Sequence, residues 1–253
     1  MSVLSPAGLF EKDSAIVEFR TNRLPLLAES GFPLSALTDD LLWSKIVAAE
    51  TELERRLRCF LCPTTVIPQG STSPPDTRWI EEPGYDYGPE LFDGNSWGMI
   101  MLRQRPIISI DSIVFAYPDL TSTLYTIPYS WIRIDKQTGL INLVPTQASM
   151  AMPLNTFLLS VLGGGRTVPL LLQIRYVCGL QNVAVEYPDV IDLIGKLAIL
   201  SILQDAFMPA SGSISADGLS QSMSFDFTKQ QDAVLQRIET LRQAIHGIRS
   251  IVC

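Results

Sequence analysis

Residues 190–208, VIDLIGKLAILSILQDAFM, are the feature that most limits how this chain can fold. Pro188 and Asp189 are typical of a helix start, and apolar side chains surround nearly the whole circumference of the predicted helix. Polar and charged side chains interrupt the run, among them Asp192, Lys196, Gln204 and Asp205. Because such groups are costly in hydrocarbon, we interpret the segment as a buried helix and not as a membrane span. We therefore expect other elements to cover it on most sides.

The composition indicates a well-packed protein with a large buried or interfacial area. The chain has 253 residues, of which 47% are hydrophobic and 18% charged, enough for one substantial core or for a core with a satellite domain. Its formal net charge of −7 disfavours tight nucleic-acid binding, which depends on Lys and Arg. The N-terminus lacks the basic start and the continuous apolar run of a signal peptide, so none is predicted.

Residues 38–60 predict a long amphipathic helix. Thr38 is a suitable N-cap, and Asp39 and Asp40 favour the positive end of the helix dipole. Apolar residues recur at spacings of three and four: Leu42, Ile46, Ala49, Leu53, Leu57 and Phe60. We assign this helix and the Pro/Gly-rich segment after it, together residues 37–98, to a helical core.

The last helix is predicted from about Lys229 to the end of the chain. Its apolar residues form a narrow seam: Val234, Ile238, Leu241, Ile245, Ile248 and Val252. The seam is too short to establish a coiled coil, and packing on one neighbouring helix is the plainer interpretation. We expect it to be buried against a helix of the same chain or of a partner.

A β-domain is predicted between the helices, over residues 99–187. The sequence SWIRIDKQTGLINLVP alternates as two strands joined by a turn at 136–139, where Gly139 suits a positive φ. In the first strand Trp131, Arg133 and Asp135 share one face. Residues 163–165, three glycines, lack the strand–loop–helix context of a phosphate site, and they predict a bend that leads into a closing strand.

Two further segments carry no regular period. Residues 1–36 contain three prolines, and we expect an extended arm there. Residues 76–93 contain six acids and the single cation Arg78. Because the spacing of an EF-hand is absent, we interpret the acidic segment as a solvated loop pinned by its aromatic residues and not as a metal site.

The chain offers few residues for catalysis. Cys59 and Cys62 form a C-x-x-C pair without the second pair of a structural zinc site, and His246 is the only histidine. A Ser-His-Asp or Cys-His mechanism would depend on His246 alone. We therefore expect reduced, inert cysteines, no metal, no cofactor and no enzymatic activity. The remaining enzyme hypothesis is a hydrolase that uses acids of residues 76–93, although any acidic loop offers such pairs.

Residues 211–227, SGSISADGLSQSMSFDF, lie between the last two predicted helices. Gly212 and Gly218 permit close backbone approach, and the segment carries apolar side chains that a free linker does not need. These are Leu219, Met223, Phe225 and Phe227. We predict a docking loop for another protein chain, with a solvated interhelical loop as the alternative.

Three segments and a final charged helix occur in an order that resembles the head-to-tail adaptors of tailed bacteriophages, also called connector or neck proteins. The segments are IPYSWIRIDKQTGLINLVP, YPDVIDLIGKLAILSILQDAF and SISADGLSQSMS, and the similarity covers residues 127–253. Its most specific part is SADGLSQSMS. Adaptor sequences often continue from here through a longer Gly-rich stretch, whereas Phe225 and Phe227 lead directly into the helix in this chain.

The resemblance implies an α+β protein whose helical adaptor-type core, residues 37–61 and 188–253, carries an inserted antiparallel β-domain. It implies a homo-oligomeric ring of about twelve copies below the portal protein, matching a portal's symmetry. The ring would sit in the virion at the head–tail junction, after assembly in the host cytoplasm. Another neck, tail or baseplate component is the alternative within the structural class, and a virion-associated hydrolase is the alternative of another class.

The implied partners are the portal, other neck or tail proteins, and DNA that passes through the channel without sequence-specific binding. No membrane is involved. An acidic channel wall would repel the phosphate backbone and let DNA slide. The predicted interface residues come from the docking loop and the terminal seam: Asp217, Gly218, Leu219, Ser220, Gln221, Ser222, Met223, Phe225, Phe227, Ile238, Leu241, Ile245 and Ile248.

Overall fold

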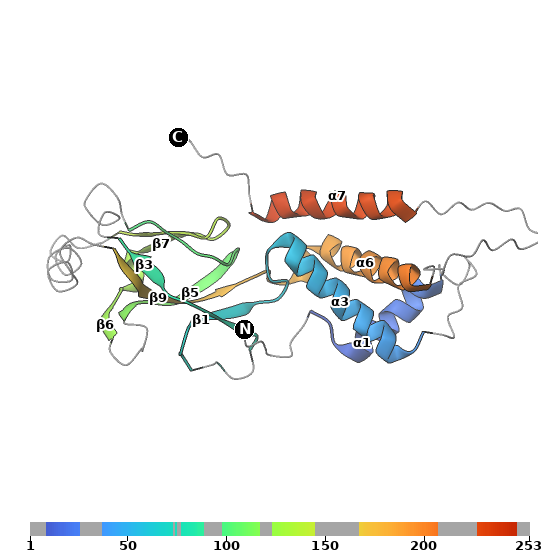
Figure 1. The fold of residues 1–253 in the computed structure, drawn as a ribbon, viewed down its shortest axis with the longest axis horizontal. Coiled ribbons are helices and arrows are strands. Elements are labelled where there is room, and N and C mark those ends of the chain that lie inside the picture. The colour runs from blue at the N-terminus through green and yellow to red at the C-terminus, as the bar shows by residue number, and fades with distance from the viewer. Residues whose placement is uncertain are drawn as a thin grey trace, which may run out of the picture. The chain divides into compact units, whose positions relative to one another are not determined.

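The computed structural model describes residues 9–25, 37–72, 74, 77–88, 98–116, 123–144, 167–206 and 227–246. The chain has an α+β fold and divides into two compact units, drawn in Figure 1. The helical unit consists of Gly8–Arg58 and Asn182–Ala244, and the β unit consists mainly of Cys59–Gln181. The β unit is therefore inserted in the sequence between the two segments of the helical unit.

In its described residues, the helical unit contains three long helices and three short ones. They are α1 (Lys12–Glu18), the π-helix η1 (Phe19–Arg23), α3 (Asp39–Leu57), α5 (Val183–Glu186), α6 (Pro188–Ala206) and α7 (Phe227–His246). The long helices α3, α6 and α7 each begin within two residues of the predicted start. The three helix predictions are thus confirmed.

Helix α3 begins and packs as its sequence predicts. The Thr38 hydroxyl accepts a hydrogen bond from the Leu41 N–H at 3.3 Å, so Thr38 is the N-cap. Five predicted apolar positions are buried: Leu42, Ile46, Ala49, Leu53 and Leu57. The helix ends at Arg58, which adopts a left-handed conformation with φ 56°. Phe60 lies beyond this end and is only half-buried.

Helix α6 is the centre of the helical unit, and the prediction that it is covered on most sides is confirmed. Of its residues 188–205, only Pro188, Gln204 and Asp205 are exposed. Helices α3 and α5 pack against it, η1 reaches it through Arg23, and α7 reaches it through an ion pair with Asp192. In the described part of the chain, this cover comes from the same subunit.

The prediction of an extended N-terminal arm over residues 1–36 is wrong for Lys12–Arg23, which form α1 and η1. Their apolar side chains Ala15, Ile16 and Phe19 are buried, and α1 packs against α3. A helix this short is marginal on its own and is stabilised by tertiary packing. Too few apolar residues repeat over this length to give a sustained period.

The β unit contains two sheets. Its strands are β1 (Thr64–Pro68), β2 (Trp79–Glu82), β3 (Tyr85–Tyr87), β4 (Ile100–Met101), β5 (Ile107–Ala116), β6 (Thr123–Thr126), β7 (Ile132–Asp135), β8 (Leu140–Leu143) and β9 (Val168–Cys178). The larger sheet has the order β2-β1-β9-β5-β6, with β3 also paired to β9, and the smaller has the order β4-β8-β7. Buried side chains from both sheets form one core, which includes Tyr87, Phe115, Trp131 and Tyr176.

The predicted boundaries of the β-domain are wrong at both ends. Strands β1 and β3 pair with β9, and β2 pairs with β1, so the sheet already begins within the segment 62–98 that was assigned to the helical core. At the other end, α5 belongs to the helical unit. The predicted closing strand β9 is the central strand of its sheet. Pairings between strands this far apart leave no local sequence pattern.

The predicted hairpin is confirmed as β7–β8. Ile132 pairs with Leu143 and Ile134 with Ile141, and Gly139 in the turn has φ 72°. The shared face predicted for Trp131 is wrong, because Trp131 ends a 3-10 turn (Tyr129–Trp131) and is buried, whereas Arg133 is exposed.

Candidate functional site

The predicted interface residues fall into two groups. Those of the predicted docking loop, Asp217, Gly218, Leu219, Ser220, Gln221, Ser222, Met223 and Phe225, lie outside the described residues, as does Ile248. Phe227 is the first residue of α7. Ile238, Leu241 and Ile245 lie on α7 and are 3%, 7% and 4% exposed. The structure therefore brings together only the members on the terminal helix.

The seam of α7 is buried within the chain itself. Val234 is 7% exposed, like Leu241, while Asp232, Gln236 and Glu239 on the outer side are exposed. Arg237 pairs with Asp192 near the start of α6, and Gln231 lines the same cavity as Gln204 near its end, so the two helices run antiparallel, as Figure 1 shows. Of the two expected locations for this seam, the structure gives the one within the same chain.

A cavity of about 100 Å³ lies beneath the first half of α7. Its walls come from α3, α6 and α7: Glu52, Arg56, Leu197, Leu200, Ser201, Gln204, Gln231, Val234 and Leu235. Glu52 and Arg56 form an ion pair at 2.6 Å, and Lys45 bridges α3 to Ser201 and Asp205 of α6. Among the described lining residues, Glu52 is the one carboxylate, and it is paired with Arg56.

Asp192 connects three elements of the helical unit. It forms ion pairs with Lys196 at 2.8 Å, with Arg237 of α7 at 3.3 Å and with Arg23 of η1 at 3.6 Å. Burial alone would raise the pKa of Asp192, but the hydrogen bond from Lys196 and the three positive charges together lower it. This carboxylate thus holds η1 and α7 to α6.

Gly195 is required by the path of the Arg23 side chain. A Cβ at Gly195 would lie 2.2 Å from an Arg23 guanidinium nitrogen, closer than any contact allows. Arg23 is held there by Glu18 at 3.5 Å and by Asp192, and its guanidinium lies over the Phe19 ring. A glycine in the middle of a helix is normally destabilising, and here it permits a close approach.

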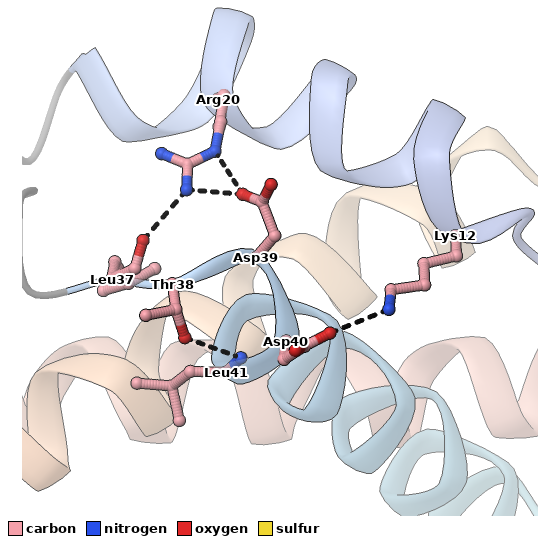
Figure 2. A network of polar contacts seen from close by, with 7 residues as sticks. All are labelled: Lys12, Arg20, Leu37, Thr38, Asp39, Asp40 and Leu41. Atoms are coloured by element: carbon pink, nitrogen blue, oxygen red, sulfur yellow. Dashed lines mark hydrogen bonds and ion pairs between the residues drawn. The ribbon is translucent and has the colours of Figure 1, made fainter.

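A second polar cluster joins α1 and η1 to the N-terminus of α3 (Figure 2). Arg20 donates two hydrogen bonds to Asp39, at 2.6 and 2.8 Å, and a third to the Leu37 carbonyl. Lys12 bonds to Asp40 at 2.8 Å and lowers the pKa of that carboxyl. The acids that favour the positive end of α3 therefore also dock the N-terminal helices.

The β unit contains a buried carboxylate, Glu82, which is 7% exposed. The hydroxyls of Tyr85 and Tyr176 both donate to its Oε2, each at 3.1 Å. The Tyr85 hydroxyl accepts a hydrogen bond from the backbone N–H of Arg103, and the Tyr176 hydroxyl accepts one from the backbone N–H of Gln104. The Arg103 guanidinium stacks on the Tyr85 ring. The cluster fixes the segment between β4 and β5 over the edge of the larger sheet.

This cluster is closed to a substrate. Burial raises the pKa of Tyr85 to about 12 and also raises that of Tyr176, so both hydroxyls stay protonated and keep donating to Glu82. Asp86, another acid of residues 76–93, accepts a hydrogen bond from the Leu170 N–H. Glu82 and Asp86 therefore serve the fold, whereas Glu81 is exposed on β2. Nothing in the geometry of these three acids favours the hydrolase alternative.

The cysteines and the histidine do not converge on a common site. Among the described residues, no group of three or more His, Cys, Asp or Glu side chains could hold a metal ion. Cys59, Cys62 and Cys178 are thiols without a disulfide, and burial raises the pKa of Cys178. His246 is at the C-terminal end of α7 and is half-buried. No helix in the described part of the chain is long and apolar enough to cross a membrane.

The exposed apolar residues of the helical unit are the surface feature that the sequence reasoning missed. Val185 on α5 is 82% exposed, and Leu41 and Val47 lie on the outer side of α3. The spacing of Val47, Thr51 and Arg55 in the sequence could have indicated this outer surface of α3, because residues four apart share a helix face. For α5, which is a single turn, the sequence contains no comparable signal.

No model of a known protein family matches the chain, and a search of curated proteins finds no match either.

Proposed function

We propose that this protein is a structural component of a tailed-bacteriophage virion, a head-to-tail adaptor that forms a ring below the portal and surrounds the DNA channel. The observation that carries the proposal is the order of the hairpin, the apolar helix, the Ser-rich segment and the terminal helix along residues 127–253. Further support comes from the helical unit, which is split in sequence by a β unit, the organisation that the resemblance implies.

The distribution of charge also supports a role around DNA. By sequence, the helical unit has 11 Lys and Arg against 17 Asp and Glu, a net charge of −6 out of −7 for the chain. An acidic surface repels the phosphate backbone and so lets DNA pass without binding it. In this proposal the protein has no enzymatic activity and no cofactor, and its partners are further copies of itself, the portal, and neck or tail proteins.

Electron microscopy of the purified chain, alone and mixed with the portal protein of the same phage, tests this proposal. We expect closed rings with a central channel, formed either alone or only on the portal, because a heterologous contact that closes gives a ring. Particles that stay monomeric in both preparations would overturn the proposal.

A further inference from the structure

In the helical unit, α5 carries an apolar side chain, Val185, that the described residues leave exposed. The turn is held by hydrogen bonds from the Val185 and Glu186 N–H groups to the Asn182 carbonyl, at 2.8 and 3.0 Å. Val183 points inward and is buried, whereas Val185 is 82% exposed and Glu186 beside it is also exposed. A rigid turn that presents a valine next to a carboxylate is suited to contact another surface.

A complementary surface lies on the outer side of α3. Val47, Thr51 and Arg55 follow one another at helical spacing along one face, opposite the buried positions of α3. Arg58 is the C-cap just beyond them. Val47 is 39% exposed, and both arginines are exposed. We call these four residues the outer α3 stripe. It is apolar at one end and basic at the other, and it contains no acid.

Within the described part of the chain, the charges at the two surfaces, Arg55 and Glu186, form no ion pair. Glu52 pairs with Arg56, but among the described residues no carboxylate pairs with Arg55, and no basic side chain in the described ranges pairs with Glu186. Contacts between subunits commonly place an apolar centre beside opposite charges, which fix the register. The α5 turn supplies a valine and an anion, and the outer α3 stripe supplies a valine and a cation.

We infer that the α5 turn of one copy contacts the outer α3 stripe of the next copy. The inference rests on the proposed ring and names its subunit contact. The two surfaces are on different helices, and Val185 remains exposed in the single chain, so they do not cover each other within one subunit. A contact between two different surfaces of identical chains is heterologous, which is the kind that builds a ring.

Charge reversal in the full-length chain tests the contact, with assembly measured by sedimentation and by microscopy. We expect Glu186→Arg or Arg55→Glu alone to raise the concentration needed for assembly about tenfold or more, because each places like charges together. Combining the two substitutions in one chain should restore assembly. Asp232→Arg, the same charge change at an exposed position on α7, serves as the control and should assemble normally. If a single reversal impairs folding by circular dichroism, Glu186→Gln and Arg55→Gln replace it, with a smaller loss expected.

Cross-linking gives a second measurement of the same contact. Val47→Cys and Val185→Cys, in a background with Cys62→Ser and Cys253→Ser, should give a ladder of linked species with a bismaleimide only when both are present in one chain. In a mixture of the two single variants, cross-linking should produce dimers and no larger species. If the wild-type chain forms rings but neither the charge exchange nor the ladder is observed, this contact is wrong and the proposed function stands. If the wild-type chain never assembles, with or without the portal, both the inferred contact and the proposed function are wrong.

Discussion

At Asp192 the side chains of three helical elements meet. Its carboxylate is 36% exposed and faces Arg23, Lys196 and Arg237. The pKa of Asp192 is lower in the fold than in the unfolded chain. The ionised form therefore contributes stability above the unfolded pKa, near 3.9, and this contribution is lost as the pH falls through the lower folded pKa.

The first prediction concerns Asp192→Asn. We expect this substitution to lower the free energy of unfolding at pH 7 by about 0.5–1 kcal/mol, a small value because solvent screens a carboxylate that is this exposed. The difference from wild type should shrink as the pH falls below about 4. Urea denaturation at pH 7 and pH 3 measures both values, with the exposed Asp232→Asn as the control. An effect of equal size at the two pH values would show that the ion pairs are not its cause.

The second prediction concerns Gly195→Ala. Alanine normally stabilises a helix interior by about 1 kcal/mol relative to glycine, but here the added Cβ displaces Arg23 from Glu18 and Asp192. We expect no gain, or a net loss, in the wild-type background and a gain of about 1 kcal/mol in an Arg23→Ala background. Chemical denaturation of the wild type, the two single variants and the double variant measures these free energies of unfolding. An equal effect of Gly195→Ala in both backgrounds would contradict a close approach of Arg23 to Gly195.

A third prediction applies to the buried cluster of the β unit. Tyr176→Phe removes one of two donors to Glu82 and leaves the Gln104 N–H without its acceptor. Unpaired buried polar groups cost about 1–3 kcal/mol each, so we expect a loss in that range. Tyr129→Phe, at an exposed tyrosine, is the control and should be close to neutral. Equal stabilities of the two variants in chemical denaturation would mean that the cluster contributes little.

At the scale of elements, the predictable parts of the fold are those with a long local pattern. Helices α3, α6 and α7 repeat their apolar residues over 19 or 20 positions, and the β7–β8 hairpin alternates around a glycine turn. Strands β1–β3 were missed because their pairing with β9 and with each other is non-local. Helix α1 was missed because seven residues give too few repeats for a period.

The candidate site was predictable to a smaller extent. The seam on α7 was found because its spacing is regular, although the structure buries it within the chain. The ion pairs of Arg23 with Asp192 and of Arg20 with Asp39 join residues 169 and 19 positions apart in the sequence, so no regular spacing predicts them. The exposure of Val185 could not be inferred from the sequence, because α5 is a single helical turn of four residues.

The fourth prediction belongs to α7 as an element. Leu241→Asp places an unpaired charge in the buried seam, and we expect a loss of about 3–5 kcal/mol together with lost hydrogen-exchange protection along α7. Gln243→Asp introduces the same side chain on the exposed side of the same turn and should leave the protection intact. If both variants behave alike, α7 does not dock through this seam.

At the scale of the whole molecule, the helical unit covers its own most apolar helix, α6, and buries the seam of α7. Exposed apolar side chains of this unit lie instead on α1, α3 and α5, at Val17, Leu41, Val47 and Val185, and in the proposed ring these surfaces are available to other subunits. In the proposed ring, each subunit would use an already folded helical unit as a building block, so assembly would not require refolding of its core.

The copy number and position of this protein in the virion test the proposed role most directly. Quantitative mass spectrometry of purified particles, combined with gold labelling of a tagged chain, measures both. We predict about twelve copies per particle, all located at the head–tail junction, because a ring below the portal would match its symmetry. One or two copies per particle, or label found away from the neck, would contradict the proposal that this protein is a ring-forming adaptor.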